Sequence, residues 1–290
     1  MNAKTKKMGF TGTLVKLFAA AALVLGAAAS QQAVAGIANT KHNLGMNGTG
    51  TNHASNGTEE ICVFCHTPHG SNTAVAAPLW NKALPGTSYN VYNSNSATAT
   101  TSIDGTIVPV GSVSLACLSC HDGTQAMDNM INAAGSGWGV GTGTGVSQNY
   151  TWNGTKQLAT SAVTNLGGTN GNDLTNDHPI GIEYCGGSTT TTYSGGSGGT
   201  CGDKDFKTAS KHSTKDQWWV DTGATGTGTR EKTDMILYTR SEATNGGTAK
   251  PYVECASCHD PHVEAKATNQ VAFLRVSQAD SGVCLSCHTK

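Results

Sequence analysis

The chain has 290 residues, of which 18 are basic and 19 are acidic. This balance excludes a nucleic-acid partner, because such a partner selects an excess of positive charge. Glycine accounts for 37 residues and apolar residues for only 37% of the chain, which excludes a large conventional apolar core. We therefore expect mostly irregular (coil) backbone with short helices and a few short strands.

The first 35 residues have the pattern of a secretory signal peptide. Basic residues precede an apolar run over 17–29, and Ala33-Val34-Ala35 is typical of a cleavage site. The run is too short to span a membrane, so we expect residues 36–290 to be exported, to the cell surface, the extracellular space or the periplasm. Loss of Lys4, Lys6, Lys7 and Lys16 leaves 18 − 4 = 14 basic against 19 acidic residues, a net charge of −5.

Four copies of the pattern Cys-x-x-Cys-His follow. The two thiols of such a motif add to the vinyl groups of a porphyrin, and the adjacent histidine becomes an axial iron ligand. Zinc is the alternative, but it does not require a histidine directly after the second cysteine. We therefore predict four c-type haems (haem c, iron) that organise residues 36–290 as one unit. Their covalent attachment residues are Cys62, Cys65, Cys117, Cys120, Cys255, Cys258, Cys284 and Cys287, and their proximal ligands are His66, His121, His259 and His288.

Several short elements are predicted between the first motifs. Residues 77–82 are apolar and bracketed by prolines, which indicates a packed loop with Trp80 against a porphyrin. Residues 89–92 and 107–110 alternate in polarity, and we expect them to pair as strands. The tail of the second motif, residues 122–130, favours one or two turns of helix.

Residues 135–250 form a Gly/Thr-rich insert before the third motif. Residues 135–171 are expected to be surface loop, whereas 217–220 and 235–238 have the pattern of a hairpin. Cys185 and Cys201 also lie here, and no histidine follows either of them. In an oxidising compartment this pair indicates a disulfide, with a redox-active pair as the alternative.

Each iron needs a second axial ligand or an open face. Six histidines lie outside the motifs, so histidine can occupy both axial positions of all four irons, which favours low reduction potentials. His69 and His262 each stand three residues after a proximal histidine with a proline between, so each is expected to ligate a haem other than its neighbour's. The expected distal ligands are His42, His69, His178 and His262.

The other two histidines, His53 and His212, lie among polar residues and are expected to be exposed. Methionine is the competing ligand type and would raise the potential. The candidates are Met46, Met127, Met130 and Met235.

Several phrases of the chain resemble multihaem cytochromes of metal- and sulfur-respiring bacteria. The C-terminal phrases 255–262, 273–275 and 284–290 look like their doubled C-x-x-C-H module. The four-haem count and Thr40-Lys41-His42-Asn43-Leu44 are similar to the extracellular tetrahaem cytochromes that polymerise into nanowires, the OmcE type. The phrases that resemble the wider group are 62–70, 77–81, 117–124 and 176–180.

This resemblance implies a protein that conducts electrons, with bis-histidine haems in close contact and little regular secondary structure. It implies His42, His69, His178 and His262 as distal ligands, one of them donated by a neighbouring subunit, with His69 and His42 as the candidates. Residues 188–249 fall outside the resemblance.

The leading interpretation is a tetrahaem electron carrier in extracellular electron transfer that assembles into a filament. Its partners would be redox proteins, further copies of itself and extracellular acceptors such as metal oxides. The alternatives are a soluble periplasmic shuttle, a multihaem reductase, and a scaffold or sensor with structural haem. A reductase often has lysine in place of one motif histidine, and all four motifs keep the histidine.

Overall fold

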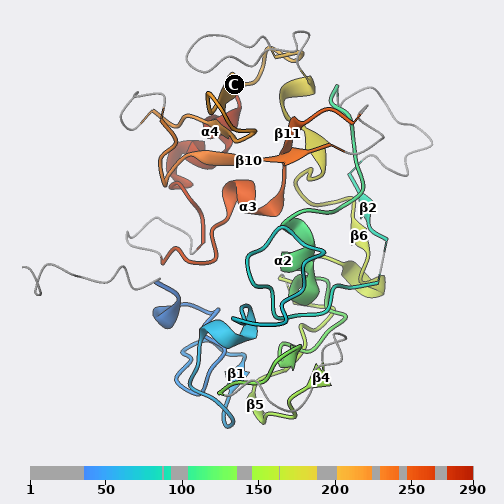
Figure 1. Cartoon of the computed structure of the whole chain (residues 1–290), viewed down its shortest axis with the longest axis vertical. Helices are drawn as coiled ribbons and strands as arrows, with labels where there is room; N and C mark the ends of the chain where they lie inside the picture. The colour runs from blue at the N-terminus through green and yellow to red at the C-terminus, as the bar shows by residue number, and fades with distance from the viewer. Residues whose placement is uncertain are drawn as a thin grey trace, which may run out of the picture. The chain divides into compact units, whose positions relative to one another are not determined.

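The computed structural model describes residues 36–86, 88–92, 104–135, 146–162, 164–187, 201–223, 229–241, 247–264 and 273–289. Residues Gly36–Lys290 form one compact unit, and the expected signal peptide lies outside the described residues. Short elements joined by long irregular segments make up this unit (Figure 1). The prediction of mostly irregular backbone is confirmed.

Each α-helix within the described residues carries motif residues. Helix α2 covers Ser114–His121, α3 covers Cys255–Cys258 and α4 covers Gly282–Cys287. None of the helices in the described ranges is long and apolar enough to cross a bilayer. The 3-10 helices are η1 Gly36–Asn39, η2 Cys62–Phe64, η3 Gly168–Asn170, η4 Tyr184–Gly186 and η6 Ala279–Ser281.

A five-stranded antiparallel sheet with the order β7-β11-β10-β9-β8 lies near the C-terminal motifs (Figure 1). The predicted hairpin is confirmed, because β9 pairs with β10 and Leu237 stands opposite Trp218. Most of this sheet therefore comes from the Gly/Thr-rich insert. The strands are β7 Ile182–Glu183, β8 Ser210–Lys211, β9 Trp218–Val220, β10 Met235–Arg240 and β11 Lys250–Val253.

Three further pairs of two-residue strands join distant parts of the chain. The predicted pairing of 89–92 with 107–110 is wrong: β2 pairs in parallel with β6, and Ile107 bridges to Ile182. Val91 and Leu174 are both buried beside Leu118, so a non-local apolar contact decides this pairing. The pairs are β1 His53–Ala54 with β5 Trp152–Asn153, β2 Asn90–Val91 with β6 Asp173–Leu174, and β3 Asn129–Met130 with β4 Val146–Ser147.

The helix expected over 122–130 is also absent, because α2 ends at His121 and the chain reaches β3 by way of turns. The Asp122 carboxylate accepts the Thr124 N–H at 2.8 Å. Gly123 follows with a φ of +72°, a left-handed conformation that stops a right-handed helix. The local hydrogen bond of an aspartate thus competes successfully with helical propensity.

The apolar core is divided into small clusters that gather at the motif cysteines. Phe64, Met127 and Met130 pack together with Cys65 and Cys120 in one cluster. In a second cluster, Tyr184, Trp218, Val220 and Met235 pack with Cys258 and Cys287. The core therefore lies where the motifs lie, as expected for a chain with few apolar residues.

Candidate functional site

Each motif is wound into about one helical turn, and this places its cysteines and histidine on one side of the backbone. The His66 N–H donates to Cys62 O at 2.7 Å, and the His288 N–H donates to Cys284 O at 2.9 Å. A single turn suffices because only two cysteines and one histidine, all within five residues, must face one porphyrin. The four motifs thus share the local shape that covalent attachment requires.

The motif cysteines are free thiols in this structure and stand for the thioethers that haem attachment would form. Consecutive motifs are neighbours in space. Burial, with a contribution from the nearby Cys120, raises the pKa of Cys65 to about 12. A hydrogen bond between the Cys117 and Cys255 side chains raises the pKa of Cys117. The first motif therefore lies beside the second in space, and the second beside the third.

The third and fourth motifs continue this series. Burial raises the pKa of Cys258, and the nearby thiols of Cys255 and Cys284 add to the effect while Arg275 opposes it. Cys258 and Cys287 also pack against the same apolar cluster. The described structure thus places each motif beside the next one in the sequence.

Two predicted distal histidines lie opposite proximal ones. The His66 and His262 ring centres are 6.1 Å apart with an interplanar angle of 16°. Those of His42 and His121 are 6.0 Å apart with an angle of 58°. Two imidazoles on opposite sides of one metal put their ring centres roughly 6 Å apart, because each metal–nitrogen bond is about 2 Å and each ring centre lies about 1 Å behind its nitrogen. Both pairs have the separation that one iron between them requires.

The remaining nitrogen of several rings is held by an acceptor. His66 Nδ1 donates to Pro78 O at 2.7 Å, and His121 Nδ1 donates to Thr164 O at 2.8 Å. His262 Nδ1 donates to the Asp260 carboxylate at 3.1 Å. This arrangement leaves Nε2 of each ring for a metal and fixes the tautomer, as in known metal sites.

His178 belongs with the fourth motif. Partial burial lowers the pKa of His178, and the nearby His288 contributes to the decrease. The ring is held by a contact of 3.2 Å between its Nδ1 and Pro179 O. His178 is therefore close enough to His288 to interact with it electrostatically.

His69 differs from the other three predicted distal ligands. Its side chain is exposed, and it lines a cavity of about 420 Å³ together with Cys62 and His66. Its neighbour Thr67 is buried, and the Thr67 hydroxyl donates to His69 O at 3.1 Å. The backbone at His69 is thus held by hydrogen bonding, while the residue itself is exposed.

His53 has no free ring nitrogen for iron. Its Nδ1 donates to Gly50 O at 2.7 Å, and its Nε2 accepts from Asn153 Nδ2 at 2.9 Å. His212 is partly exposed, and its Nδ1 accepts the Thr214 N–H at 3.2 Å. Both histidines therefore have local roles at the ends of strands.

The candidate methionines are packing or surface residues in this structure. Met127, Met130 and Met235 are buried in the apolar clusters, and Met46 is 41% exposed. Packing accounts for the first three side chains without a role at a metal.

Aromatic side chains that the sequence does not single out as ligands contact the histidines. The Phe273 ring is stacked on His42, with centres 4.2 Å apart, and Phe206 contacts His288 at the same separation. Phe273 has a φ of +71°, a strained backbone value for a residue other than glycine. Phe206 has no recognisable sequence signal, because it lies in an irregular segment far from its partner in the chain.

Two buried indole groups in the described segments offer unused donors, and one of them, Trp80, lies beside the first motif. Trp80 is 8% exposed and meets the His66 ring edge-on. Within the part of the chain that the structure describes, Trp80 Nε1 and Trp219 Nε1 are buried without a hydrogen-bond acceptor. Such donors are rare in native structures, and a carboxylate of a bound porphyrin would supply an acceptor. The residues present therefore fit c-type haem.

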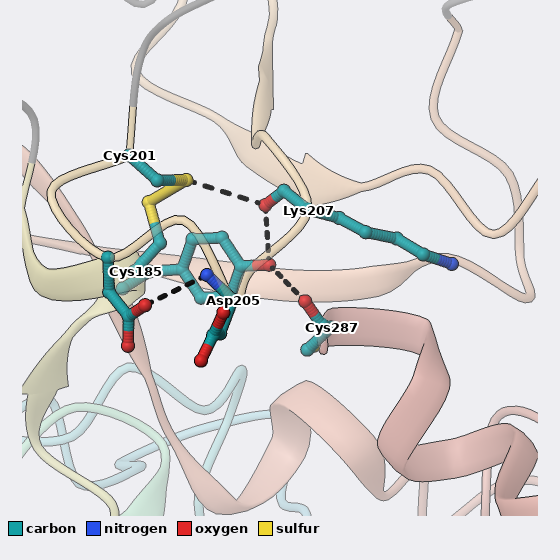
Figure 2. The surroundings of a disulfide bond; sticks show 7 residues. Cys185, Cys201, Asp205, Lys207 and Cys287 are labelled. Atoms are coloured by element: carbon teal, nitrogen blue, oxygen red, sulfur yellow. Dashed lines mark hydrogen bonds between the residues drawn. A yellow bond between two sulfur atoms is a disulfide. The ribbon is translucent and has the colours of Figure 1, made fainter. Parts of the chain in front are cut away.

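The disulfide pair lies against the fourth motif (Figure 2). Cys185 and Cys201 are bonded, with their Cα atoms 5.2 Å apart. The Tyr184 hydroxyl donates to both Lys207 O and Cys287 O, at 2.8 and 3.3 Å. The segment after Cys201 is thereby tied to the backbone of the last motif.

One protein family model matches the chain, the doubled CXXCH motif, over residues 250–290. That segment holds the third and fourth motifs. No curated protein matches the chain. The match and the motif geometry agree on a c-type-cytochrome-like protein that binds haem covalently.

Proposed function

We propose that the protein is a tetrahaem electron carrier whose four bis-histidine haems form one continuous row. The observation that carries this proposal is the pairing of His66 with His262 and of His42 with His121 at the separation of two ligands on one iron. Bound haem would supply a one-electron iron couple. The chain contributes attachment, ligand orientation and spacing.

The row gives electrons a route from the first motif to the fourth. Sulfur atoms of consecutive motifs lie close together, at Cys65 and Cys120 and at Cys117 and Cys255. Four motif cysteines are partly buried against apolar clusters, namely Cys65, Cys120, Cys258 and Cys287. We infer electron carriage rather than catalysis, because a histidine on each side of an iron leaves it no open face for a substrate.

We further propose that the chain acts outside the inner membrane and assembles into a filament. His42, His178 and His262 each lie near a proximal histidine of the same chain, whereas His69 is exposed. In this proposal His69 of one copy supplies the distal ligand of the His259 haem in the next copy. The partners would then be other copies of the chain, redox proteins and extracellular acceptors such as metal oxides.

Electron microscopy and spectroscopy of a His69→Ala variant test this proposal. The parent protein is expected to form filaments with all irons low-spin. His69→Ala is expected to stay monomeric with one high-spin iron of the four. The matched control is His53→Ala, whose ring nitrogens are already bonded, and it should behave as the parent does.

Two results separate the alternatives. If the parent protein remains monomeric with four six-coordinate irons, this result contradicts the filament and supports the periplasmic shuttle. A high-spin iron in the assembled parent protein would support the alternative of a multihaem reductase.

A further inference from the structure

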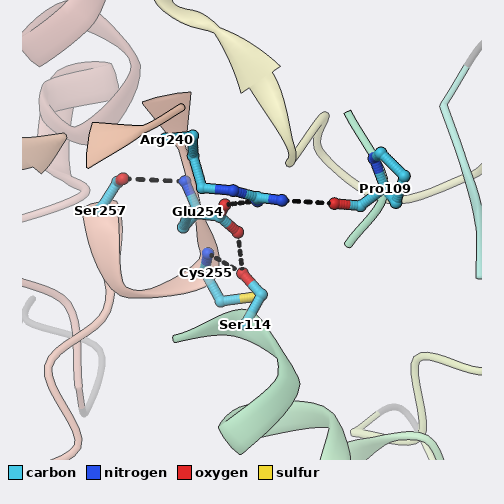
Figure 3. A network of polar contacts seen from close by, with 6 residues as sticks. All are labelled: Pro109, Ser114, Arg240, Glu254, Cys255 and Ser257. Carbon is cyan, nitrogen blue, oxygen red and sulfur yellow. Dashed lines mark hydrogen bonds and ion pairs between the residues drawn. The ribbon is translucent and has the colours of Figure 1, made fainter. Parts of the chain in front are cut away.

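Glu254 directly precedes the third motif, and its carboxylate is fully buried. The side chain of Glu254 is 0% exposed and that of Arg240 is 7% exposed. Glu254 Oε1 accepts from Arg240 at 2.6 Å, and Glu254 Oε2 accepts from the Ser114 hydroxyl at 2.5 Å (Figure 3). A buried carboxylate is tolerated only when its charge is paired and its oxygen atoms are hydrogen-bonded, and here both conditions hold.

The partners of this carboxylate come from separate segments. Ser114 is the first residue of α2 and stands 140 positions from Glu254. Arg240 ends β10, and its second terminal nitrogen donates to Pro109 O at 2.8 Å. The Ser114 hydroxyl also accepts the Cys255 N–H at 3.0 Å. One polar cluster thus joins the start of α2, the end of β10 and the start of α3.

This cluster lies directly beside two attachment cysteines. Cys117 follows Ser114 by one helical turn, and Cys255 follows Glu254. The side chains of Cys117 and Cys255 are in hydrogen-bond contact. Thioether bonds formed at these two sulfur atoms would therefore begin side by side.

We propose that Glu254 is a positioning residue that holds the second and third haem-attachment motifs at one fixed separation. The inference deepens the proposed function and rests on it, since the separation matters for electron transfer between these two haems. Hydrogen bonds have a required direction as well as a distance. A polar cluster therefore fixes two helices in register where apolar contact alone would let them slide.

Circular dichroism in the Soret region tests the proposal, because neighbouring haems give a coupled, two-signed band whose amplitude depends on their separation and angle. The first variant is Ser114→Ala, which removes the two hydrogen bonds of the Ser114 hydroxyl, to Glu254 and from the Cys255 N–H, and keeps the ion pair. The second is Arg240→Met with Glu254→Gln, which leaves no buried charge unpaired. The matched control is Glu183→Gln, since Glu183 is also buried and pairs with Lys250 at 3.0 Å, but in β7.

Both test variants are expected to keep four haems and low-spin absorption while losing about one third of the coupled band, since one of three junctions between consecutive motifs is disturbed. Glu183→Gln should keep the whole band. Test variants with four haems and the full band would overturn the proposal. If the double variant fails to fold, Ser114→Ala alone decides.

The result also separates this inference from the proposed function. A parent protein with no coupled band at all contradicts the row of haems itself. A parent with the band, together with variants that retain it, contradicts only the role of Glu254.

Discussion

The Asp260 carboxylate accepts hydrogen bonds from His262 and Arg275, and it orients His262, a predicted iron ligand. Its Oδ1 accepts from His262 Nδ1 at 3.1 Å, and its Oδ2 accepts from Arg275 Nη1 at 3.4 Å. The hydrogen bond with His262 is the main cause that lowers the pKa of Asp260 to about 2, so the carboxylate is ionised at neutral pH. A carboxylate acceptor makes the imidazole a stronger electron donor to a metal.

We expect Asp260→Asn to raise the reduction potential of one haem. The amide keeps the hydrogen bond but removes the negative charge that favours the oxidised iron. A change of about 1 kcal/mol corresponds to roughly 40 mV for a one-electron couple. A potentiometric titration should show one of four components shifted upward.

The control for this substitution is Asp216→Asn. Asp216 pairs with Lys211 at 2.8 Å, and its side chain is 56% exposed. Its replacement should leave all four components in place. An Asp260→Asn protein with unchanged potentials would show that His262 is not an axial ligand.

Residue identity predicted local shape better than it predicted contacts. The spacing within Cys62–His66 favours one turn of chain, and the structure has that turn, so the sequence alone suffices there. The choice of His262 as the partner of His66 depends on how 196 positions of chain fold back, a distance that no local pattern encodes. Phe206 and Phe273 could not be predicted as contacts of ligands for the same reason.

At the scale of elements, the segment after Cys201 supports the last motif. Lys207 N donates to Cys287 O and Thr289 N donates to Asp205 O, both at 2.8 Å. These two bonds form an antiparallel bridge that places Phe206 beside His288. The disulfide closes the loop from which this bridge begins.

We therefore expect Cys185→Ser with Cys201→Ser to affect the fourth haem selectively. Closing a loop with a sequence separation of 16 stabilises the fold by about 3 kcal/mol in the chain-entropy model. Thermal unfolding should begin at a lower temperature in the variant. The low-spin electron paramagnetic resonance signal of one haem should change, because Phe206 no longer holds the His288 ring.

The other three haems serve as the internal control for this variant. A uniform change in all four signals would indicate general destabilisation instead. Unchanged signals in a stable variant would show that the bridge to residues 287–289 holds without the disulfide.

The predicted strand pairing was correct where the two strands are close in the sequence and wrong where they are far apart. The hairpin of β9 and β10 was predicted correctly, because its two strands directly flank one turn region in the sequence. The pairing of β2 with β6 was not predicted, since these strands lie more than 80 positions apart and run in parallel. The helix predicted after His121 does not form, because the Asp122 carboxylate accepts a local hydrogen bond that closes a turn there. Helix propensity does not account for such a bond.

At the scale of the whole molecule, the clusters of apolar side chains are too small and too separate to act as one core. Several motif cysteines pack against them, among them Cys65, Cys120 and Cys258. Attached porphyrins would connect these clusters through large apolar faces. The fold and the cofactors are then one system, as in small domains that need a metal to fold.

We expect the chain produced without haem attachment to remain largely unfolded. The host for this experiment lacks the c-type maturation system, and the matched control is the same gene expressed with that system. Far-ultraviolet circular dichroism and limited proteolysis should show loss of the five-stranded sheet and rapid cleavage across residues 36–289. Apolar burial alone cannot offset the conformational entropy of so glycine-rich a chain. A haem-free protein that resists protease and unfolds cooperatively would show that the polar clusters and the disulfide suffice, and that haem only adds function to a fold already formed.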